Sequence, residues 1–255
     1  MTHSPRVFVT RPAAQAAPWA VRLRTRGLDA EALPLIEIAA VDEPRFLRDA
    51  WGSLASRRLV FFVSANAVEY FFAVRPIEVA WPDGLEAAVP GPGTAAALRE
   101  LGGATIVAVA PHDDAAQLDS EALWARLRER DWHGASVLVV RGDGGRDWLA
   151  DRLAEAGASV DAVSAYRRCV PAFAGDDRRR LDAALADSNA VWLFSSSEAI
   201  ANLESVAGRG HFASAHAVAT HPRIAARARA AGFGHVIEAG PGFDAVVACI
   251  QSIGP

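Results

Sequence analysis

The feature of this sequence that most constrains its fold is an internal repeat at an offset of about 130 residues. The segment 7–11 resembles 137–141, since each is a short apolar run that ends in Arg. The run 59–64 resembles 191–196, since each is an apolar run that ends in Ser, and here the offset is two residues longer. A duplication of this length predicts two similar halves. A chain of 255 residues is long enough to bury a substantial core in each.

Each copy of the repeat reads as strands that alternate with helices. The short apolar runs are typical of strands buried in a parallel sheet. Between them lie stretches rich in Ala, Leu and Arg with helical spacing, several of which end at a Gly suited to capping a helix. The pattern predicts an α/β fold with parallel sheets. The expected strands are 7–9, 59–63, 105–110, 137–140, 191–194 and 235–238, the expected helices are 13–26, 66–75, 94–101, 120–130, 146–156, 197–207 and 223–231, and the expected capping residues are Gly27, Gly102, Gly157 and Gly232.

Composition excludes several classes of protein. All 26 basic residues are Arg, and without Lys there is no Schiff-base, pyridoxal-phosphate or Walker-type phosphate chemistry. A net charge of −4 argues against a nucleic-acid binder, whose affinity comes from a basic field. Cys169 and Cys249 match no metal or redox spacing, and the seven His show no ligand pattern, so no metal is expected. The start of the chain is polar and no apolar run is long enough for a membrane, so we expect a cytoplasmic protein.

Arginines occupy equivalent strand ends in the two copies. Ligands of parallel α/β sheets bind at the carboxyl ends of the strands. Arg11 follows the first expected strand, Arg141 follows its repeat, and Arg146 closes a Gly-rich loop that begins at Gly142. A guanidinium there can bind a carboxylate or phosphate through two hydrogen bonds, although a solvated surface Arg is the alternative for each one alone.

Small hydroxyl residues follow another pair of equivalent strands. Ser64, with Ala65 and Asn66, precedes one expected helix, and residues 195–197, all Ser, precede the other. Such residues are common N-caps, worth about 1 kcal/mol each. A helix N-terminus also presents free N–H groups to an anion, so both turns are candidate binding sites.

The segment around Thr94 can be written G-x-G-x-x-A, with Asp113 about twenty residues further on. That spacing raises a dinucleotide-binding site as a hypothesis. Pro92 lies inside the turn, and the second copy lacks both glycines. A helix that is capped by Thr94 and binds an anion at its N-terminus is therefore a more modest prediction than a dinucleotide-binding site. Tyr166, at the end of the strand after Gly157, is either a core residue with a satisfied hydroxyl or a proton donor in a cleft.

Seven motifs occur in an order that resembles the uroporphyrinogen-III synthase family, and together they cover nearly the whole chain. They are Val-Thr-Arg-Pro at 9–12, Phe-Val-Ser-Ala-Asn-Ala-Val at 62–68, Gly-Thr-Ala-x-x-Leu at 93–98, Ser-Glu-x-Leu at 120–123, the Arg-Gly to Gly-Arg loop at 141–146, the strand with Tyr166, and Phe-Ser-Ser-Ser at 194–197.

The resemblance implies two flavodoxin-like parallel-sheet domains joined by a two-stranded connector, with the active site in the cleft between them. In the family, the first βαβ unit belongs with the C-terminal half. Residues 1–37 and 170–255 would then form one domain and 40–167 the other, with connector strands at 34–39 and 166–171.

The resemblance also implies a lyase that cyclises hydroxymethylbilane to uroporphyrinogen III, with inversion of the last pyrrole ring and loss of water. This reaction of haem, sirohaem and cobalamin biosynthesis uses no cofactor, and the family's enzymes are commonly monomers. Tyr166 matches the tyrosine proposed as proton donor. The substrate carries eight carboxylates, which Arg side chains and helix N-termini can bind. The expected substrate-binding residues are Arg11, Ser64, Ala65, Asn66, Thr94, Arg141, Gly142, Arg146, Ser195, Ser196, Ser197 and Thr220.

One departure from the family concerns the second copy. The family often repeats Gly-x-x-Thr-Ala there, whereas this chain has His-Pro-Arg-Ile-Ala at 221–225. Thr220 or the backbone would take the place of the missing Thr. Two other functions stay open from the residues alone: a non-catalytic two-domain binder or sensor of a small anionic ligand, and a nucleotide-dependent enzyme that uses the turn at Gly91.

Overall fold

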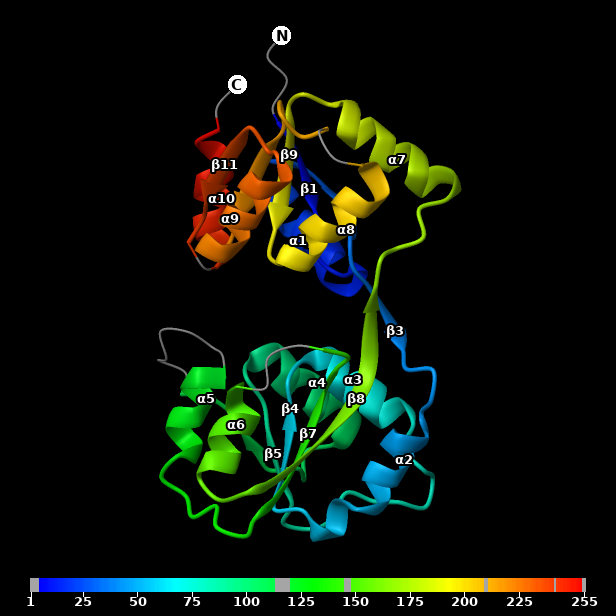
Figure 1. The fold of residues 1–255 in the computed structure, drawn as a ribbon, viewed down its shortest axis with the longest axis vertical. Coiled ribbons are helices and arrows are strands. Elements are labelled where there is room, and N and C mark those ends of the chain that lie inside the picture. The colour runs from blue at the N-terminus through cyan, green and yellow to red at the C-terminus, as the bar shows by residue number, and fades with distance from the viewer. Residues whose placement is uncertain (1–4, 113–119, 145–147, 209–210, 241, 254–255) are drawn as a thin grey trace. The chain divides into compact units, whose positions relative to one another are not determined.

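The computed structural model describes the chain except for residues 1–4, 113–119, 145–147, 209–210, 241 and 254–255. The chain forms two compact units. Unit 1 consists of Met1–Glu37 and Cys169–Pro255, and unit 2 consists of Ile38–Arg168. Each unit is a separate α/β sandwich with its own sheet (Figure 1).

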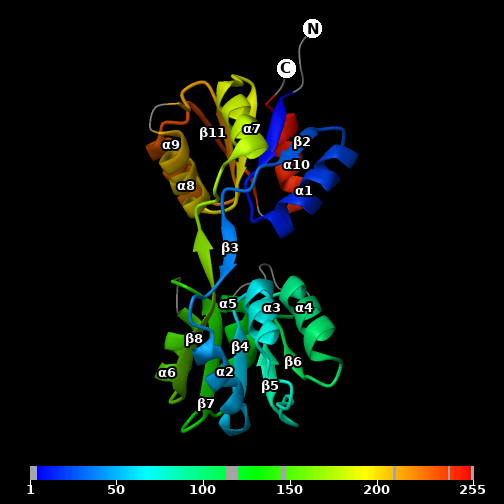
Figure 2. The same cartoon turned by 90° about the vertical axis from the view of Figure 1, so that its right-hand side faces the viewer.

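Unit 1 is built on a five-stranded parallel sheet in the order β11-β10-β9-β1-β2. Its centre is almost wholly buried, as the apolar runs predict. Helices α1 and α10 pack on one face of the sheet, and α8 and α9 lie on the other (Figure 2). The strands are β1 (Arg6–Val9), β2 (Asp29–Ala32), β9 (Ala190–Phe194), β10 (His216–Ala219) and β11 (His235–Glu238), and the helices are α1 (Ala13–Thr25), α7 (Gly175–Ala186), α8 (Ser197–Ala207), α9 (Pro222–Ala231) and α10 (Phe243–Gln251).

Unit 2 has a six-stranded sheet in the order β3-β8-β7-β4-β5-β6. The strands from β8 to β6 are parallel, and β3 runs opposite to its neighbour β8 (Figure 2). The strands are β3 (Glu37–Ala40), β4 (Leu59–Phe62), β5 (Glu86–Ala88), β6 (Ala108–Val109), β7 (Ser136–Gly142) and β8 (Ser159–Cys169), and the helices are α2 (Arg45–Gly52), α3 (Ala65–Ala73), α4 (Pro92–Gly102), α5 (Ser120–Leu127) and α6 (Trp148–Glu155), with a 3-10 turn at Leu54–Ser56.

The two sheets have the same strand order once the repeat is applied. By sequence offset, β1 corresponds to β7 and β9 corresponds to β4. Sheet order β2-β1-β9-β10-β11 in unit 1 therefore matches β8-β7-β4-β5-β6 in unit 2. Each sheet combines the first two strands of one copy with the last three strands of the other. The fold class expected from the sequence, α/β with parallel sheets in two units, is confirmed.

Some expected element boundaries are wrong. Gly102 is the last residue of α4, and the capping residue is Gly103, with φ +87°. Within the expected strand 105–110, only Ala108–Val109 forms a strand. A short edge strand of this kind buries few residues, so the hydrophobic pattern of the sequence does not mark its bounds. Within the described residues, no helix has the length and hydrophobicity that crossing a membrane requires.

A close backbone contact holds the loop before β10 against the loop before β11. Gly234 donates its N–H to Phe212 O at 3.2 Å. A Cβ on Gly234 would lie 1.9 Å from the carbonyl oxygen of Ala213, which is backbone and cannot rotate away. Only Gly is compatible with this approach.

We therefore expect Gly234→Ala to lower the free energy of unfolding by about 3 kcal/mol, a typical cost of forced overpacking. Urea unfolding followed by circular dichroism measures the change. Gly52→Ala is the matched control, because a Cβ on that helical residue meets no atom within 4 Å. Equal stabilities for the two variants would contradict the contact.

Candidate active site

The carboxyl ends of β4, β5 and β7 bring the expected residues of unit 2 to one edge of its sheet. The strands are neighbours, with Phe62 of β4 opposite Val140 of β7. Ser64 follows β4 and is the N-cap of α3, because its Oγ accepts a hydrogen bond from Ala67 N at 3.2 Å. The capping role expected for Ser64 is confirmed. Ala65 and Asn66 form the first turn of that helix, where their N–H groups have no intrahelical acceptor.

Tyr166 joins this edge from β8, on the far side of β7. Its ring is buried in the core of unit 2, with 2% of the residue exposed. Its hydroxyl lies 3.1 Å from Ser64 Oγ and accepts a longer hydrogen bond, 3.4 Å, from Arg168 Nη2. The ring therefore reaches across β7 from β8 to the end of β4. Ser64 and Arg168 are both half-buried, so the hydroxyl end of the ring lies at the edge of the sheet.

Gly142 makes this crossing possible. The register between β7 and β8 shifts between Arg141 and Gly142, so that Gly142 pairs with Tyr166. A Cβ on Gly142 would lie 2.7 Å from two atoms of the Tyr166 ring and 3.0 Å from its hydroxyl oxygen. Gly142 thus leaves room for the Tyr166 ring.

Thr94 does not cap its helix, contrary to the sequence-based prediction. The N-cap of α4 is Gly91, Pro92 is the first helical residue, and Thr94 is 6% exposed. Its hydroxyl is therefore buried inside the first turn. Arg141 lies half-buried within β7, near the carboxyl end. Arg146 and Asp113 lie outside the described residues.

Unit 1 has an equivalent edge at the carboxyl ends of β10, β9 and β1. Ser195 follows β9, and Ser196 caps α8 by accepting a hydrogen bond from Glu198 N at 3.1 Å. Ser197 Oγ is buried and has no hydrogen-bond partner among the described residues. Thr220 follows β10 and donates its N–H to Phe194 O at 3.1 Å. The next helix, α9, is capped by His221, whose Nδ1 accepts from Arg223 N.

Arg11 lies at the same edge, two residues after the end of β1. Its guanidinium carbon is 4.3 Å from the centroid of the Trp19 ring. Burial lowers the pKa of the Arg11 side chain, and its Nε has no hydrogen-bond partner among the described residues. A desolvated cation without a counter-charge is costly, and an anionic ligand would offset that cost.

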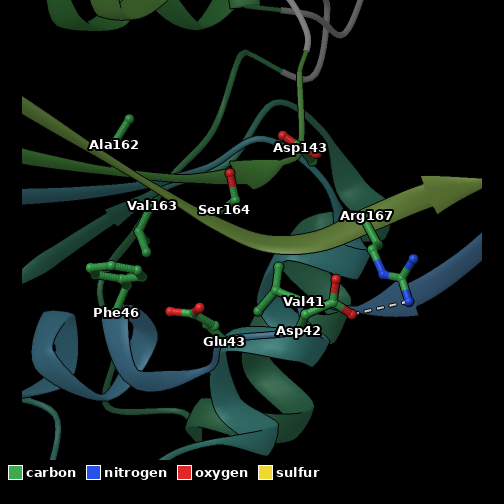
Figure 3. Close-up of a pocket in the computed structure, with 9 residues that line it drawn as sticks. All are labelled: Val41, Asp42, Glu43, Phe46, Asp143, Ala162, Val163, Ser164 and Arg167. Carbon is green, nitrogen blue, oxygen red and sulfur yellow. Dashed lines mark ion pairs between the residues drawn. The ribbon is translucent and has the colours of Figure 1, made fainter.

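A pocket of about 400 Å³ lies beside β8 and the start of α2 (Figure 3). Its carboxylates are Asp42, Glu43 and Asp143, and Asp42 pairs with Arg167 at 3.2 Å. This acidic lining is unsuited to an anion. The sequence does not predict this pocket, because its residues come from three segments that only the fold brings together. Among the described residues, no group of three or more His, Cys, Asp and Glu side chains could hold a metal ion.

Comparisons with known proteins agree on one family. The family model described as Uroporphyrinogen-III synthase HemD matches residues 17–248. Uroporphyrinogen-III synthase from Proteus mirabilis is 32% identical over 163 residues, which is 64% of this chain and 79% of the relative. The enzyme of the same name from Salmonella typhimurium is 32% identical over 173 residues, 66% of this chain and 67% of the relative.

The fold also matches a solved structure. The crystal structure of uroporphyrinogen-III synthetase from Helicobacter pylori aligns with a TM-score of 0.66 over 98% of this chain and all of the other, at 15% identity. At this identity the match concerns the fold.

The packing of Tyr166 on Gly142 predicts a strong coupling between the two residues. Gly142→Ala should lower the free energy of unfolding by about 2 kcal/mol, because the methyl group forces the buried ring aside. In a Tyr166→Ala background the same substitution should cost little, since the ring is gone. Urea unfolding of the four proteins measures this double-mutant cycle. An equal cost of Gly142→Ala in both backgrounds would contradict the packing.

Proposed function

The chain belongs to the uroporphyrinogen-III synthase family, and from this premise we propose that it cyclises hydroxymethylbilane to uroporphyrinogen III. The enzyme is a lyase of tetrapyrrole biosynthesis. The observation that carries the proposal at the level of the site is the Tyr166 hydroxyl, which is held at a strand edge by Ser64 and Arg168.

In this proposal, the residues at the carboxyl ends of the strands in both sheets bind the substrate. The linear tetrapyrrole carries eight carboxylates and no group that needs a metal. The first turns of α3 and α8 supply free N–H groups, which favour carboxylates because of the helix dipole. Arg11 and Arg141 add guanidinium groups at the ends of β1 and β7. We assign Arg11, Ser195, Ser196, Ser197 and Thr220 in unit 1, and Ser64, Ala65, Asn66, Thr94, Arg141, Gly142 and Arg146 in unit 2, to carboxylate binding.

Tyr166 supplies the proton for loss of water. Ser64 Oγ accepts from Ala67 N, so its own hydrogen is free to be donated to Tyr166. With Arg168 also donating, the Tyr166 oxygen accepts two hydrogen bonds and keeps its proton for the substrate. That proton goes to the terminal hydroxyl as its C–O bond breaks, and water leaves. The same two donors stabilise the tyrosinate, which recovers a proton when the attacking pyrrole carbon loses one on ring closure.

The alternative of a non-catalytic binder is not favoured, because the family match extends over residues 17–248 and the named relatives are enzymes. The nucleotide hypothesis has no support from the turn at Gly91, where Thr94 is buried.

Product analysis tests the proposed reaction directly. Hydroxymethylbilane, generated enzymatically, is incubated with the protein, and the products are oxidised and separated by isomer. Isomer III is expected, because spontaneous closure without inversion gives isomer I. Isomer I alone would refute the function.

Tyr166→Phe should lower kcat by about 100-fold, the lower range for a lost general acid, while KM changes little. Turnover should not vanish, since the bound substrate is still held in a reactive geometry. Tyr70→Phe is the matched control: Tyr70 is the other tyrosine, its ring lies 6.1 Å from that of Tyr166, and its hydroxyl donates to Ile38 O. Steady-state kinetics of both variants decide the role, and equal kcat values would rule it out.

A further inference from the structure

We propose that Arg11 and Arg22 form a paired carboxylate site on unit 1, built on the rings of Trp19 and Phe243, and that it binds two neighbouring carboxylate arms of the substrate. This inference rests on the proposed function and specifies part of its binding site. Trp19 and Phe243 are positioning residues, because they act through the two arginines.

The four side chains form one continuous cluster. Trp19 and Phe243 pack edge to face, with centroids 5.3 Å apart. The guanidinium carbon of Arg11 is 4.3 Å from the centroid of Trp19. That of Arg22 is 3.9 Å from the centroid of Phe243 and 6.0 Å from that of Trp19. Both guanidinium groups thus lie within cation–π distance of the Trp19 ring.

Two members of the cluster follow the carboxyl ends of strands in unit 1. Arg11 follows β1, and Phe243 is the first residue of α10, which follows β11. Both therefore lie on the side where the parallel strands end. Trp19 and Arg22 come from α1, one turn apart, and side chains of a helix point toward its N-terminus. That direction returns Arg22 toward Phe243. Trp19 and Phe243 also pack against the buried core that α1, α10 and the sheet share, and this packing fixes the positions of the two rings.

The charge of this cluster is not neutralised by carboxylates. Within the part of the chain that the structure describes, neither Arg11 nor Arg22 has an acidic partner. The carboxylate next to the cluster, Asp244, is paired with Arg26 at 2.6 Å. Arg11 is in addition largely desolvated. An aromatic face attracts a guanidinium but leaves the edge of the guanidinium, with its N–H donors, free.

The two guanidinium groups and their aromatic contacts indicate a ligand with two carboxylates. Two guanidinium groups with free N–H edges bind two carboxylates, each through paired hydrogen bonds. The acetate and propionate arms on one pyrrole ring present two carboxylates from adjacent ring carbons. The aromatic platforms hold both arginines in place before binding, which lowers the entropic cost of ordering these long side chains.

The test uses two stable porphyrins that differ in carboxylate number. Uroporphyrin carries acetate and propionate arms, whereas coproporphyrin lacks the acetate carboxylates. Binding of each to the full-length protein is measured by fluorescence titration, together with KM and kcat for hydroxymethylbilane. The variants are Arg22→Gln, Trp19→Leu and Trp19→Phe. Arg26→Gln is the control, because it removes the same charge from the end of α1, where the guanidinium has a carboxylate partner.

Arg22→Gln should raise KM and the Kd for uroporphyrin about tenfold, the loss expected for a charged hydrogen bond, with kcat and coproporphyrin binding little changed. Trp19→Leu should have a similar effect, and Trp19→Phe should restore most of the affinity because it keeps an aromatic face. Arg26→Gln should leave KM within twofold of the parent.

Equal KM values for Arg22→Gln and Arg26→Gln would overturn the proposal, even if the parent protein forms isomer III. Thermal unfolding of Trp19→Leu separates loss of the platform from loss of the fold, and Arg22, which is exposed, gives a second variant that should not affect folding. If the parent forms no isomer III but uroporphyrin binding still depends on Arg22, the paired site stands and the proposed reaction fails.

Discussion

The contact on which the unit 2 site depends is the packing of the Tyr166 ring across Gly142. The side chains of a central strand normally keep the side chains of its two neighbouring strands apart. Here the end of β7 is Gly142, which has no side chain. The Tyr166 ring of β8 therefore reaches Ser64, which follows the end of β4. The same Ser64 caps α3, so one hydroxyl links the proposed proton donor to a helix N-terminus, which favours anions. Ser64 therefore holds both the proposed catalytic hydroxyl and the proposed carboxylate-binding turn in place.

In unit 1, an aromatic ring positions a charged side chain near a strand end. Arg11 is held near a strand end where burial removes much of its hydration, and the Trp19 ring takes the place of part of that water. The Lys-free composition suits this arrangement, since a guanidinium stacks on a ring and still presents its N–H groups. Many arginines of the described residues form ion pairs with Asp or Glu, such as Arg6, Arg26 and Arg180. The binding roles that we propose concern only a few arginines near strand ends.

The fold was largely predictable because its signals are local and repeated. The internal duplication and the apolar runs predict the central strands, and the capping role predicted for the Ser residues before α3 and α8 is confirmed for Ser64 and Ser196. Residues on neighbouring strand ends were predictable as groups, because parallel strands place their carboxyl ends together.

Contacts that cross the sheet were not predictable. The distance between Tyr166 and Ser64 depends on the register shift at Gly142, which no sequence pattern marks. The Arg11 guanidinium lies over the ring of Trp19, which the sequence places only within the expected helix 13–26. Thr94 does not cap α4, because Pro92 is the first helical residue and Gly91 the cap, three residues before the predicted one.

The central claim is that Ser64 acts on the reaction through the Tyr166 hydroxyl. A double-mutant cycle on the rate constant of a single turnover tests it, with Ser64→Ala, Tyr166→Phe and the double variant, each at saturating enzyme. If the two groups act as one unit, the double variant should be no slower than Tyr166→Phe alone. Losses in rate that multiply in the double variant would show that Ser64 acts independently of Tyr166, which would contradict this account.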